Sequence, residues 1–409
     1  MARRYTSKQT KLTRKADVVM LGTYPPRECG IATFTQDLVL SLRQWPELVS
    51  GVGVCAVNDW PASYRYGPDV RFTLEDGRLP SYRRTAQHLN HSGSDLICIQ
   101  HEYGIFGGQD GKYVLDLMKW LQLPVVTTLH TVLSKPKGHF RAVTQEIIKR
   151  SDAIVVLAEN ARQLLISTCN ADPEKIHYVP HGIPDVEWSP ALIEARKREL
   201  GLEGRTVVAT FGLLSPGKGI EYALEALPEV VSEHPDVLYL ILGRTHPTIM
   251  RQQGEQYRQQ LIDRCHALSI EDNVRFVNRY LSLKDLIRYL QGTDIYLMPY
   301  LNPEQIVSGT LAYAVGAGKP TIATAFAYAT EVLADGRGIV VPFRDSQAIS
   351  HALFELLEDE DSRLEMAARA YQHTRSWVWR SVGLCYAQLF HEILRQREIE
   401  PISATQATA

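Results

Sequence analysis

The stretch FGLLSPGKGIEYALEAL, from Phe211 to Leu227, decides the fold expected for this chain. The apolar run TVVAT precedes it, so a buried strand is predicted to end at Gly212. A turn with the sequence Pro-Gly-Lys-Gly follows, and apolar residues then recur at helical spacing. A strand, a glycine-rich turn and a helix in this order form the repeating unit of a doubly wound α/β sheet.

The same alternation of short apolar runs and helical patterns extends over most of the 409 residues. Runs that are almost entirely Val, Ile and Leu are typical of parallel strands with both faces buried. We predict two series of strands, namely DVVMLGT, VGVCAV, DLICIQ, PVVTTLH, DAIVVLA and IHYVPHG before residue 185, and TVVATFG, VLYLILG, VRFVN, DIYLMPY, PTIATA and GIVVPF after residue 205. The polar segment 185–205 separates them, so two similar domains that face each other are expected.

The predicted organisation has six parts. They are a basic tail (1–16), a first domain (17–190), a linker (191–205), a second domain (206–376), a long amphipathic helix (377–399) and a disordered tail (400–409).

Composition and charge exclude several classes of protein. The formal net charge of −2 lacks the basic excess of a nucleic-acid-binding protein. The apolar runs have the length of strands, and none approaches the roughly 18 residues of a membrane span. The N-terminus, MARRYTSKQTKLTRKAD, is basic and lacks the apolar segment of a secretory signal. It is interpreted as a disordered tail or as a weak contact with an anionic membrane surface.

The six cysteines are scattered and form no Cys-x-x-Cys pair. They predict reduced thiols in a cytoplasmic protein. No clustered spacing of His and Cys is present, so no metal site built from protein ligands is expected. The sequence predicts no particular oligomeric state.

Ligands of doubly wound sheets bind beyond the C-terminal ends of the strands, so residues that follow strands are the candidates. In the first domain these are Gly30, where a helix begins, His101 in QHEYGIFGG, and His130 in VTTLHT. A helix N-terminus offers free N–H groups, and an imidazole can orient a polar substrate. The alternatives stay open: an ordinary connection at Gly30, and structural histidines hydrogen-bonded within the fold.

In the second domain, Lys218 lies between two glycines at the start of a helix, where free amides and the ammonium charge attract phosphate. Gly219 follows the lysine, so the stretch is not a Walker A loop, and an ordinary turn with an exposed lysine is the alternative. A second loop offers polar side chains, amides and hydroxyls for another side of a phosphate: Glu304, Gln305, Ser308, Gly309 and Thr310.

Taken together, these stretches resemble the retaining nucleotide-sugar glycosyltransferases of family 4, which have the GT-B fold. The resemblance covers roughly residues 17–395 and depends on many motifs in order. The motifs are TTLHT, SDAIVVLAENARQLL, IHYVPHGIPD, FGLLSPGKGIEYALEALPEV, VRFVNRYLSLKDLIRYLQGTDIYLMPY, YATEVLADGRGIVVPFRD and RSWVWRSVGLCYAQLFHEIL.

The resemblance implies two Rossmann-like domains facing a cleft, with a C-terminal helix that crosses back onto the first domain. It implies that Lys218 holds the donor diphosphate, that Gly30 lets the backbone approach it, and that His130 contacts the transferred sugar near its anomeric carbon. His101 is expected on the acceptor side. The loop 276–282 is expected to face the nucleobase.

The chain departs from the family pattern at the positions of three charged side chains. The family's phosphate-binding arginine falls on Leu213, and Arg244 in LILGRTHP is the expected substitute. The family's pair of glutamates falls on Gln305 and Tyr313. Glu304 lies one residue out of register, and a local shift would make it the first carboxylate of the catalytic site.

One further position differs, because His181 replaces the asparagine of the family's PNG turn. These changes predict a divergent subfamily and leave open a protein that has lost activity.

The expected reaction transfers a hexose, with retention, from a nucleoside-diphosphate sugar to a carbohydrate or lipid-linked acceptor. Mannose from GDP-mannose and glucose from UDP-glucose are the leading donors. No metal or further cofactor is expected, because Lys218, Arg244 and helix ends supply positive charge to the leaving diphosphate. The alternatives are a non-catalytic nucleotide- or sugar-binding protein, and another GT-B enzyme such as an epimerase or a phosphorylase. A nicotinamide dehydrogenase is disfavoured, because no Gly-x-Gly-x-x-Gly follows the first strand.

Overall fold

The computed structural model describes residues 15–61 and 64–399. Residues 1–14 of the predicted N-terminal tail and the predicted C-terminal tail, 400–409, lie outside the described residues. Contacts divide the chain into two units. Of the described residues, the first unit holds 15–61, 64–157, 162–180 and 379–399, and the second holds 158–161 and 181–378. Residues 191–205, expected as a linker, fall in the second unit.

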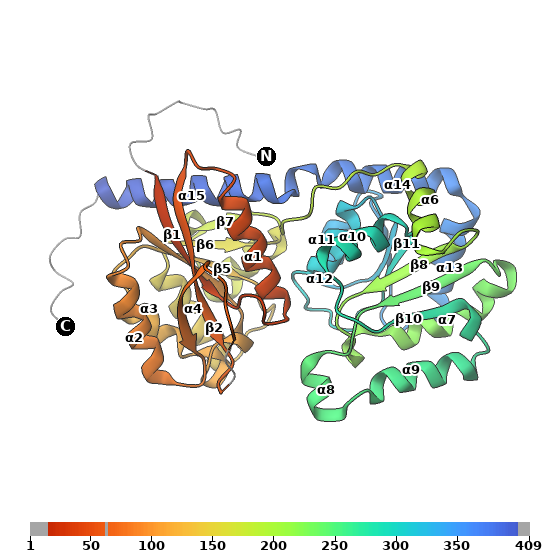
Figure 1. The fold of residues 1–409 in the computed structure, drawn as a ribbon, viewed down its shortest axis with the longest axis horizontal. Helices are drawn as coiled ribbons and strands as arrows, with labels where there is room; N and C mark the ends of the chain where they lie inside the picture. The colour runs from red at the N-terminus through yellow and green to blue at the C-terminus, as the bar shows by residue number, and fades with distance from the viewer. Residues whose placement is uncertain (1–14, 62–63, 400–409) are drawn as a thin grey trace. The chain divides into compact units, whose positions relative to one another are not determined.

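The first unit is built on a seven-stranded sheet with the strand order β3-β2-β1-β4-β5-β6-β7 (Figure 1). Its paired strands all run parallel. The strands are β1 (Ala16–Gly22), β2 (Val49–Asn58), β3 (Val70–Glu75), β4 (Leu96–His101), β5 (Val125–Leu129), β6 (Ala153–Val156) and β7 (Ile176–Tyr178). The helices are α1 (Gly30–Leu42), α2 (Leu79–Asn90), α3 (Val114–Trp120), α4 (His139–Arg150), α5 (Glu159–Cys169), of which 162–169 fall in this unit, and α15 (Trp379–Ile399).

The second unit repeats this plan with a six-stranded parallel sheet in the order β10-β9-β8-β11-β12-β13. Its strands are β8 (Thr206–Phe211), β9 (Val237–Leu242), β10 (Val274–Val277), β11 (Ile295–Met298), β12 (Thr321–Thr324) and β13 (Ile339–Val341). Its helices are α6 (Pro190–Leu200), α7 (Ile220–Glu233), α8 (Pro247–Gln253), α9 (Gln256–Ala267), α10 (Leu283–Gln291), α11 (Gly309–Gly316), α12 (Ala327–Val332), α13 (Ser346–Glu358) and α14 (Glu360–His373). The predicted α/β class is confirmed.

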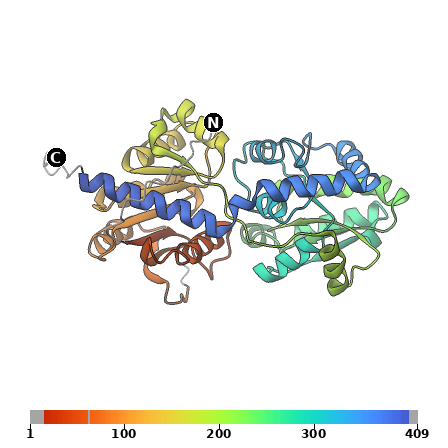
Figure 2. The ribbon, with the colours of Figure 1, turned by 90° about the horizontal axis from the view of Figure 1, so that it is seen from above.

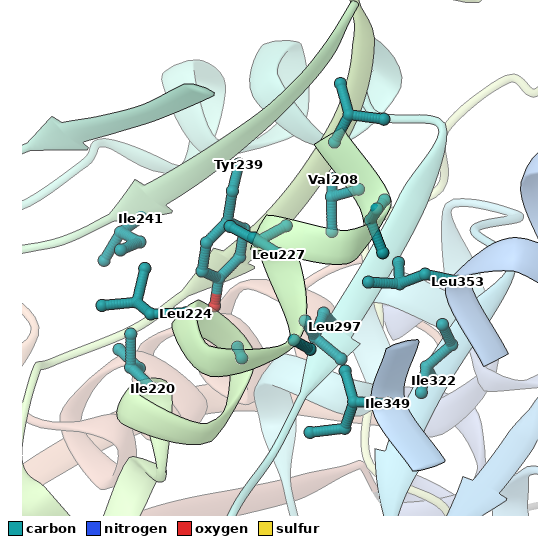
Figure 3. Packing of buried hydrophobic residues seen from close by; sticks show 14 of the residues in the cluster. Val208, Ile220, Leu224, Leu227, Tyr239, Ile241, Leu297, Ile322, Ile349 and Leu353 are labelled. Atoms are coloured by element: carbon teal, nitrogen blue, oxygen red, sulfur yellow. The ribbon is translucent and has the colours of Figure 1, made fainter. Parts of the chain in front are cut away.

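A large buried cluster of the second unit lies between its sheet and the helices α7 and α13. Leu224 and Leu227 of α7 face Tyr239 of β9, and Ile349 and Leu353 of α13 belong to the same cluster (Figure 3). Each of these side chains is at most 1% exposed. Burial of this continuous apolar surface fixes α7, and therefore the turn that precedes it.

The C-terminal helix α15 packs on the first unit, as the resemblance implied (Figure 2). The Trp45 indole donates to the Arg380 carbonyl at 2.9 Å, and the Tyr386 hydroxyl lies 2.9 Å from the Thr128 hydroxyl of β5. At the far end of the helix, Arg397 pairs with Asp152 at 2.8 Å. A search of the described helices finds none that is both long and apolar enough to span a membrane.

Candidate functional site

The strand order identifies one place in each sheet where a ligand is expected to bind. The strand order reverses at β1 in the first unit and at β8 in the second, because the next strands along the chain lie on opposite sides of these two. Doubly wound sheets bind their ligands at the C-terminal ends of the strands at such a switch point. The loops of Gly30 and His101 follow β1 and β4, and those of Lys218 and Ser308 follow β8 and β11.

The Lys218 turn is shaped by a left-handed glycine. Residues Pro216–Lys218 form a 3-10 turn, and Gly219 then adopts a φ of 62° before α7 begins. A Cβ on Gly219 would collide with the Pro299 carbonyl oxygen, so only glycine fits at this position. The turn is thereby held against the chain segment that follows β11.

The ammonium of half-buried Lys218 lies over an aromatic ring. Its Nζ is 3.6 Å from the centroid of the Tyr300 ring, which is a cation–π contact. Within residues 15–61 and 64–399, Lys218 forms no ion pair and its Nζ donates no hydrogen bond to a protein atom. The sequence alternative of an ordinary exposed lysine therefore does not describe this side chain.

Tyr300 also links the lysine to the Ser308 turn. Its hydroxyl lies 3.1 Å from Thr310 Oγ1, which lies 3.0 Å from Ser308 Oγ. Ser308 caps α11 by accepting the Leu311 N–H at 3.3 Å. The structure therefore brings Lys218, Ser308 and Thr310 together through one buried tyrosine that sequence analysis did not single out.

Arg244 follows β9 and is tied to the Lys218 side of the site through the backbone. Its carbonyl accepts the Leu214 N–H at 2.9 Å. Its half-buried guanidinium carbon lies 6.0 Å from the centroid of the Tyr280 ring. The expected substitute for the missing arginine is thus adjacent to the loop that carries Leu213.

The two positions at which the family has glutamates are occupied by Gln305 and Tyr313. Glu304 is exposed, and the Asn302 side chain accepts its backbone N–H at 3.1 Å. Gln305 donates from its side-chain amide to the Val307 carbonyl at 3.2 Å. Tyr313 is buried in α11, with its ring centroid 6.0 Å from that of His181. In the described structure, neither family position carries a carboxylate.

In the first unit, His130 is held by Gln100 and Phe34. Its Nε2 lies 3.0 Å from Gln100 Oε1, and this oxygen can only accept, so Nε2 carries the proton. The Phe34 ring meets the imidazole edge-on at a centroid distance of 4.7 Å. Gly30 opens α1, and a Cβ added there would meet no described atom within 4 Å. Packing does not require this glycine, which leaves space over the helix start.

His101 lies deeper than the acceptor-side role implies. It is 1% exposed and stacks on Phe106 at 5.7 Å, with Tyr103 edge-on at 5.0 Å. Burial lowers its pKa to about 3, so the ring is neutral. Neither ring nitrogen has a hydrogen-bond partner in the described part of the chain, so the hydrogen-bonded structural role is not observed.

The neighbouring Glu102 was not a predicted site residue. Its carboxylate accepts the Thr131 hydroxyl at 2.5 Å and the Tyr103 N–H at 2.9 Å, and burial raises its pKa. The glycines of this loop differ in how closely they are packed, because a Cβ on Gly104 would meet nothing within 4 Å. A Cβ on Gly107 would collide with the Asp76 carbonyl, so close packing explains that residue.

Two family models match the chain. The model described as Glycosyltransferase Family 4 matches residues 39–187, and the model described as Glycosyl transferases group 1 matches residues 193–373. A GDP-mannose-dependent monoacylated alpha-(1-6)-phosphatidylinositol monomannoside mannosyltransferase of Corynebacterium glutamicum is 29% identical over 387 residues, which covers 90% of this chain and 95% of the relative. A D-inositol 3-phosphate glycosyltransferase of Corynebacterium glutamicum is 26% identical over 324 residues, covering 75% and 74%.

Solved structures share the whole architecture. Sucrose-phosphate synthase from Thermosynechococcus elongatus superposes with a TM-score of 0.75 at 16% identity, covering 93% of this chain and 100% of that one. The Anabaena protein HepE in complex with UDP superposes with a TM-score of 0.72 at 17% identity, covering 92% and 100%. At these identities the likeness establishes the fold.

Proposed function

Because this chain belongs to glycosyltransferase family 4 and has the GT-B fold, we propose that it transfers mannose or glucose, with retention, from a nucleoside-diphosphate sugar to an acceptor hydroxyl. The observation that carries the proposal is the half-buried ammonium of Lys218, held over Tyr300 without a carboxylate partner among the described residues. A partly desolvated cation without a counter-charge favours an anionic ligand. The diphosphate of a sugar nucleotide supplies that charge.

The rest of the second unit's candidate site supports the same ligand. Tyr300 contacts both Lys218 and Thr310, in the first turn of α11, which Ser308 caps. The Arg244 carbonyl accepts the N–H of Leu214, in the loop that leads to Lys218. When the bond between the anomeric carbon and the diphosphate breaks, negative charge grows on the leaving oxygens. Cationic side chains and oriented amides already in place stabilise that charge in the transition state.

We propose that a departing phosphate oxygen takes the proton of the acceptor hydroxyl on the face from which the diphosphate leaves. Configuration at the anomeric carbon is then retained without a protein nucleophile. His130, with its Nε2–H directed to Gln100, would orient the transferred sugar. Glu304 would contribute only after a movement of its exposed loop.

The relatives support one donor and acceptor class more than others. A relative whose alignment with this chain covers 95% of its own length is named as GDP-mannose-dependent and as acting on a phosphatidylinositol monomannoside. This supports mannose as the sugar and a lipid-linked acceptor. HepE structures with UDP-glucose keep glucose as the second candidate.

The test is turnover of labelled GDP-mannose and UDP-glucose by the purified protein, with phosphatidylinositol mannoside and inositol 3-phosphate as acceptors. We expect transfer of one hexose, a product with the donor's anomeric configuration by NMR, and an unchanged rate in EDTA. Lys218→Ala should abolish transfer, and Lys284→Ala, an exposed lysine of α10, should not. A Lys218→Ala variant with the wild-type rate would show that the donor site is misplaced.

A non-catalytic nucleotide-binding protein is the second candidate, and one observation favours it. Gln305 and Tyr313 stand where the family has its two glutamates, and neither has a carboxylate. That protein would bind a nucleoside diphosphate through Lys218 but leave every sugar nucleotide intact in the same assay.

A further inference from the structure

A histidine with no role so far, His246, lies in the loop that follows β9, close enough to Lys218 for the lysine charge to lower its pKa. The His246 N–H donates to the Leu214 carbonyl at 2.9 Å, and the Leu214 N–H donates to the Arg244 carbonyl at 2.9 Å. These two bonds pair Leu214 with Thr245 as in a parallel sheet. The loops that follow β8 and β9 are therefore joined by backbone hydrogen bonds.

This pairing decides which side chains share a face. Successive side chains of paired extended segments point to opposite faces. Leu214 and Thr245 face inward, at 2% and 1% exposure. Leu213, Arg244 and His246 therefore share the other face, and all three are half-buried. Arg244 and His246 thus lie on the same surface as Leu213, and the pairing places Arg244 next to the leucine.

The helix that follows sets the tautomer of His246. Its Nδ1 accepts the Thr248 N–H at 3.2 Å, which caps the start of α8. A ring nitrogen that accepts carries no proton, so Nε2 of the neutral ring carries it and is a donor. Within the described residues, no acceptor receives this Nε2–H.

The surroundings keep the ring neutral. Burial lowers the pKa of His246, and the nearby charges of Lys218 and Arg251 lower it further. A neutral donor can lie close to these two cations without the repulsion that another charge would bring. A phosphate oxygen offers several lone pairs, so it can accept from an ammonium and an imidazole N–H together.

We propose that His246 binds the donor diphosphate through its Nε2–H, as a third group beside Lys218 and Arg244. This inference depends on the proposed function, because it names a further contact of the same ligand. It makes His246 a binding residue that recognises phosphate and not the nucleoside.

Two substitutions separate binding from helix capping. His246→Asn keeps a short side-chain oxygen, which is a favourable helix cap, but removes the distal N–H. His246→Gln returns an amide N–H near the position of Nε2 and loses the short cap. The ligands are UDP and GDP, with uridine and guanosine as matched probes without phosphate.

Calorimetric titration of the full chain gives the test. We expect His246→Asn to weaken binding of the preferred diphosphate about tenfold, as for a lost hydrogen bond to a charged group, and to leave nucleoside affinity and the thermal midpoint unchanged. His246→Gln should recover part of the diphosphate affinity. Equal loss for diphosphate and nucleoside, or no loss, would overturn the inference.

The same titrations distinguish failure of the proposed function from failure of the role of His246. If the wild type binds the diphosphate and Lys218→Ala weakens it, while His246→Asn has no effect, the proposed function stands and the role of His246 fails. If the wild type binds neither diphosphate, both fail.

Discussion

His181 and Tyr313 lie against each other in the second unit, with their ring centroids 6.0 Å apart. Burial lowers the pKa of His181 to about 4, so its ring is neutral. Its Nδ1 lies 2.8 Å from the Gly182 carbonyl, which can only accept, so Nδ1 carries the proton. The unprotonated Nε2 lies on the side of Gly309, the first residue of α11.

This contact explains why residue 309 is glycine. A Cβ added there would lie 2.9 Å from His181 Nε2. We expect Gly309→Ala to lower the free energy of unfolding by about 1–3 kcal/mol, the usual cost of overpacking. In a His181→Ala background the cost should largely disappear, because the imidazole that the added methyl group would meet is then absent. Urea denaturation of the four variants measures this coupling, and strictly additive costs would show that the imidazole is not the obstacle.

A buried lysine provides a prediction about pH. Lys319 is 1% exposed and donates to the Thr293 carbonyl at 2.9 Å, and burial lowers its pKa from 10.5 to about 7. Asp294 opposes that shift and Lys197 adds to it. Between these two pKa values the unfolded chain binds more protons than the folded one. Stability from this group therefore increases with pH, by at most about 1.4 kcal/mol per unit.

The measurement compares the wild type with Lys319→Met from pH 7 to pH 9. We expect the free energy of unfolding of the wild type, relative to that of the variant, to increase as the pH rises. The reason is that the variant has no titrating group at this position. Parallel curves would mean that Lys319 titrates at its ordinary pKa.

At the scale of elements, the interior strands could be predicted from the sequence and one edge strand could not. Val18, Val19, Met20 and Leu21 of β1 are fully buried, and such runs are apolar throughout. β3 reads VRFTLE, with exposed residues alternating along it, because it pairs only with β2 at the edge of its sheet. A half-exposed edge strand does not show the continuous apolar run on which the prediction depended.

In the candidate site, likewise, some residues could be predicted from the sequence and some contacts could not. Lys218, Ser308 and Arg244 could be predicted because each follows a strand in a recognisable motif. The ring of Tyr300 under Lys218 and the contact of His181 with Tyr313 join segments far apart in the chain. Side-chain packing, and not local pattern, decides such contacts, so neither could be predicted.

The helix pair α1–α15 carries a prediction at this scale. A Cβ on Gly383, within α15, would overlap Ser41 of α1. Alanine favours a helix over glycine by about 1 kcal/mol, yet we expect Gly383→Ala to lower the thermal midpoint, because the helices must separate. Gln388→Ala, at an exposed position of the same helix, is the control and should not lower it. A midpoint raised by Gly383→Ala would contradict the close packing.

At the scale of the molecule, the same doubly wound plan occurs twice in one chain. The first unit has seven strands and the second has six, and each has a candidate residue in the loop after the strand where the order reverses, Gly30 after β1 and Lys218 after β8. The two units carry different chemistry there. The second has lysine, arginine and a capped helix start, which suit a diphosphate, and the first has the neutral imidazole of His101 and the buried carboxyl group of Glu102, which suit sugar hydroxyls.

The central claim is that Lys218 binds the diphosphate of the donor, and the dissociation constants of UDP and GDP test it most directly. Lys218→Met should weaken the preferred nucleotide about 10- to 100-fold, as for a lost hydrogen bond to a charged group, while Lys284→Met binds like the wild type. Unchanged affinity in Lys218→Met, next to measurable binding by the wild type, would contradict the account.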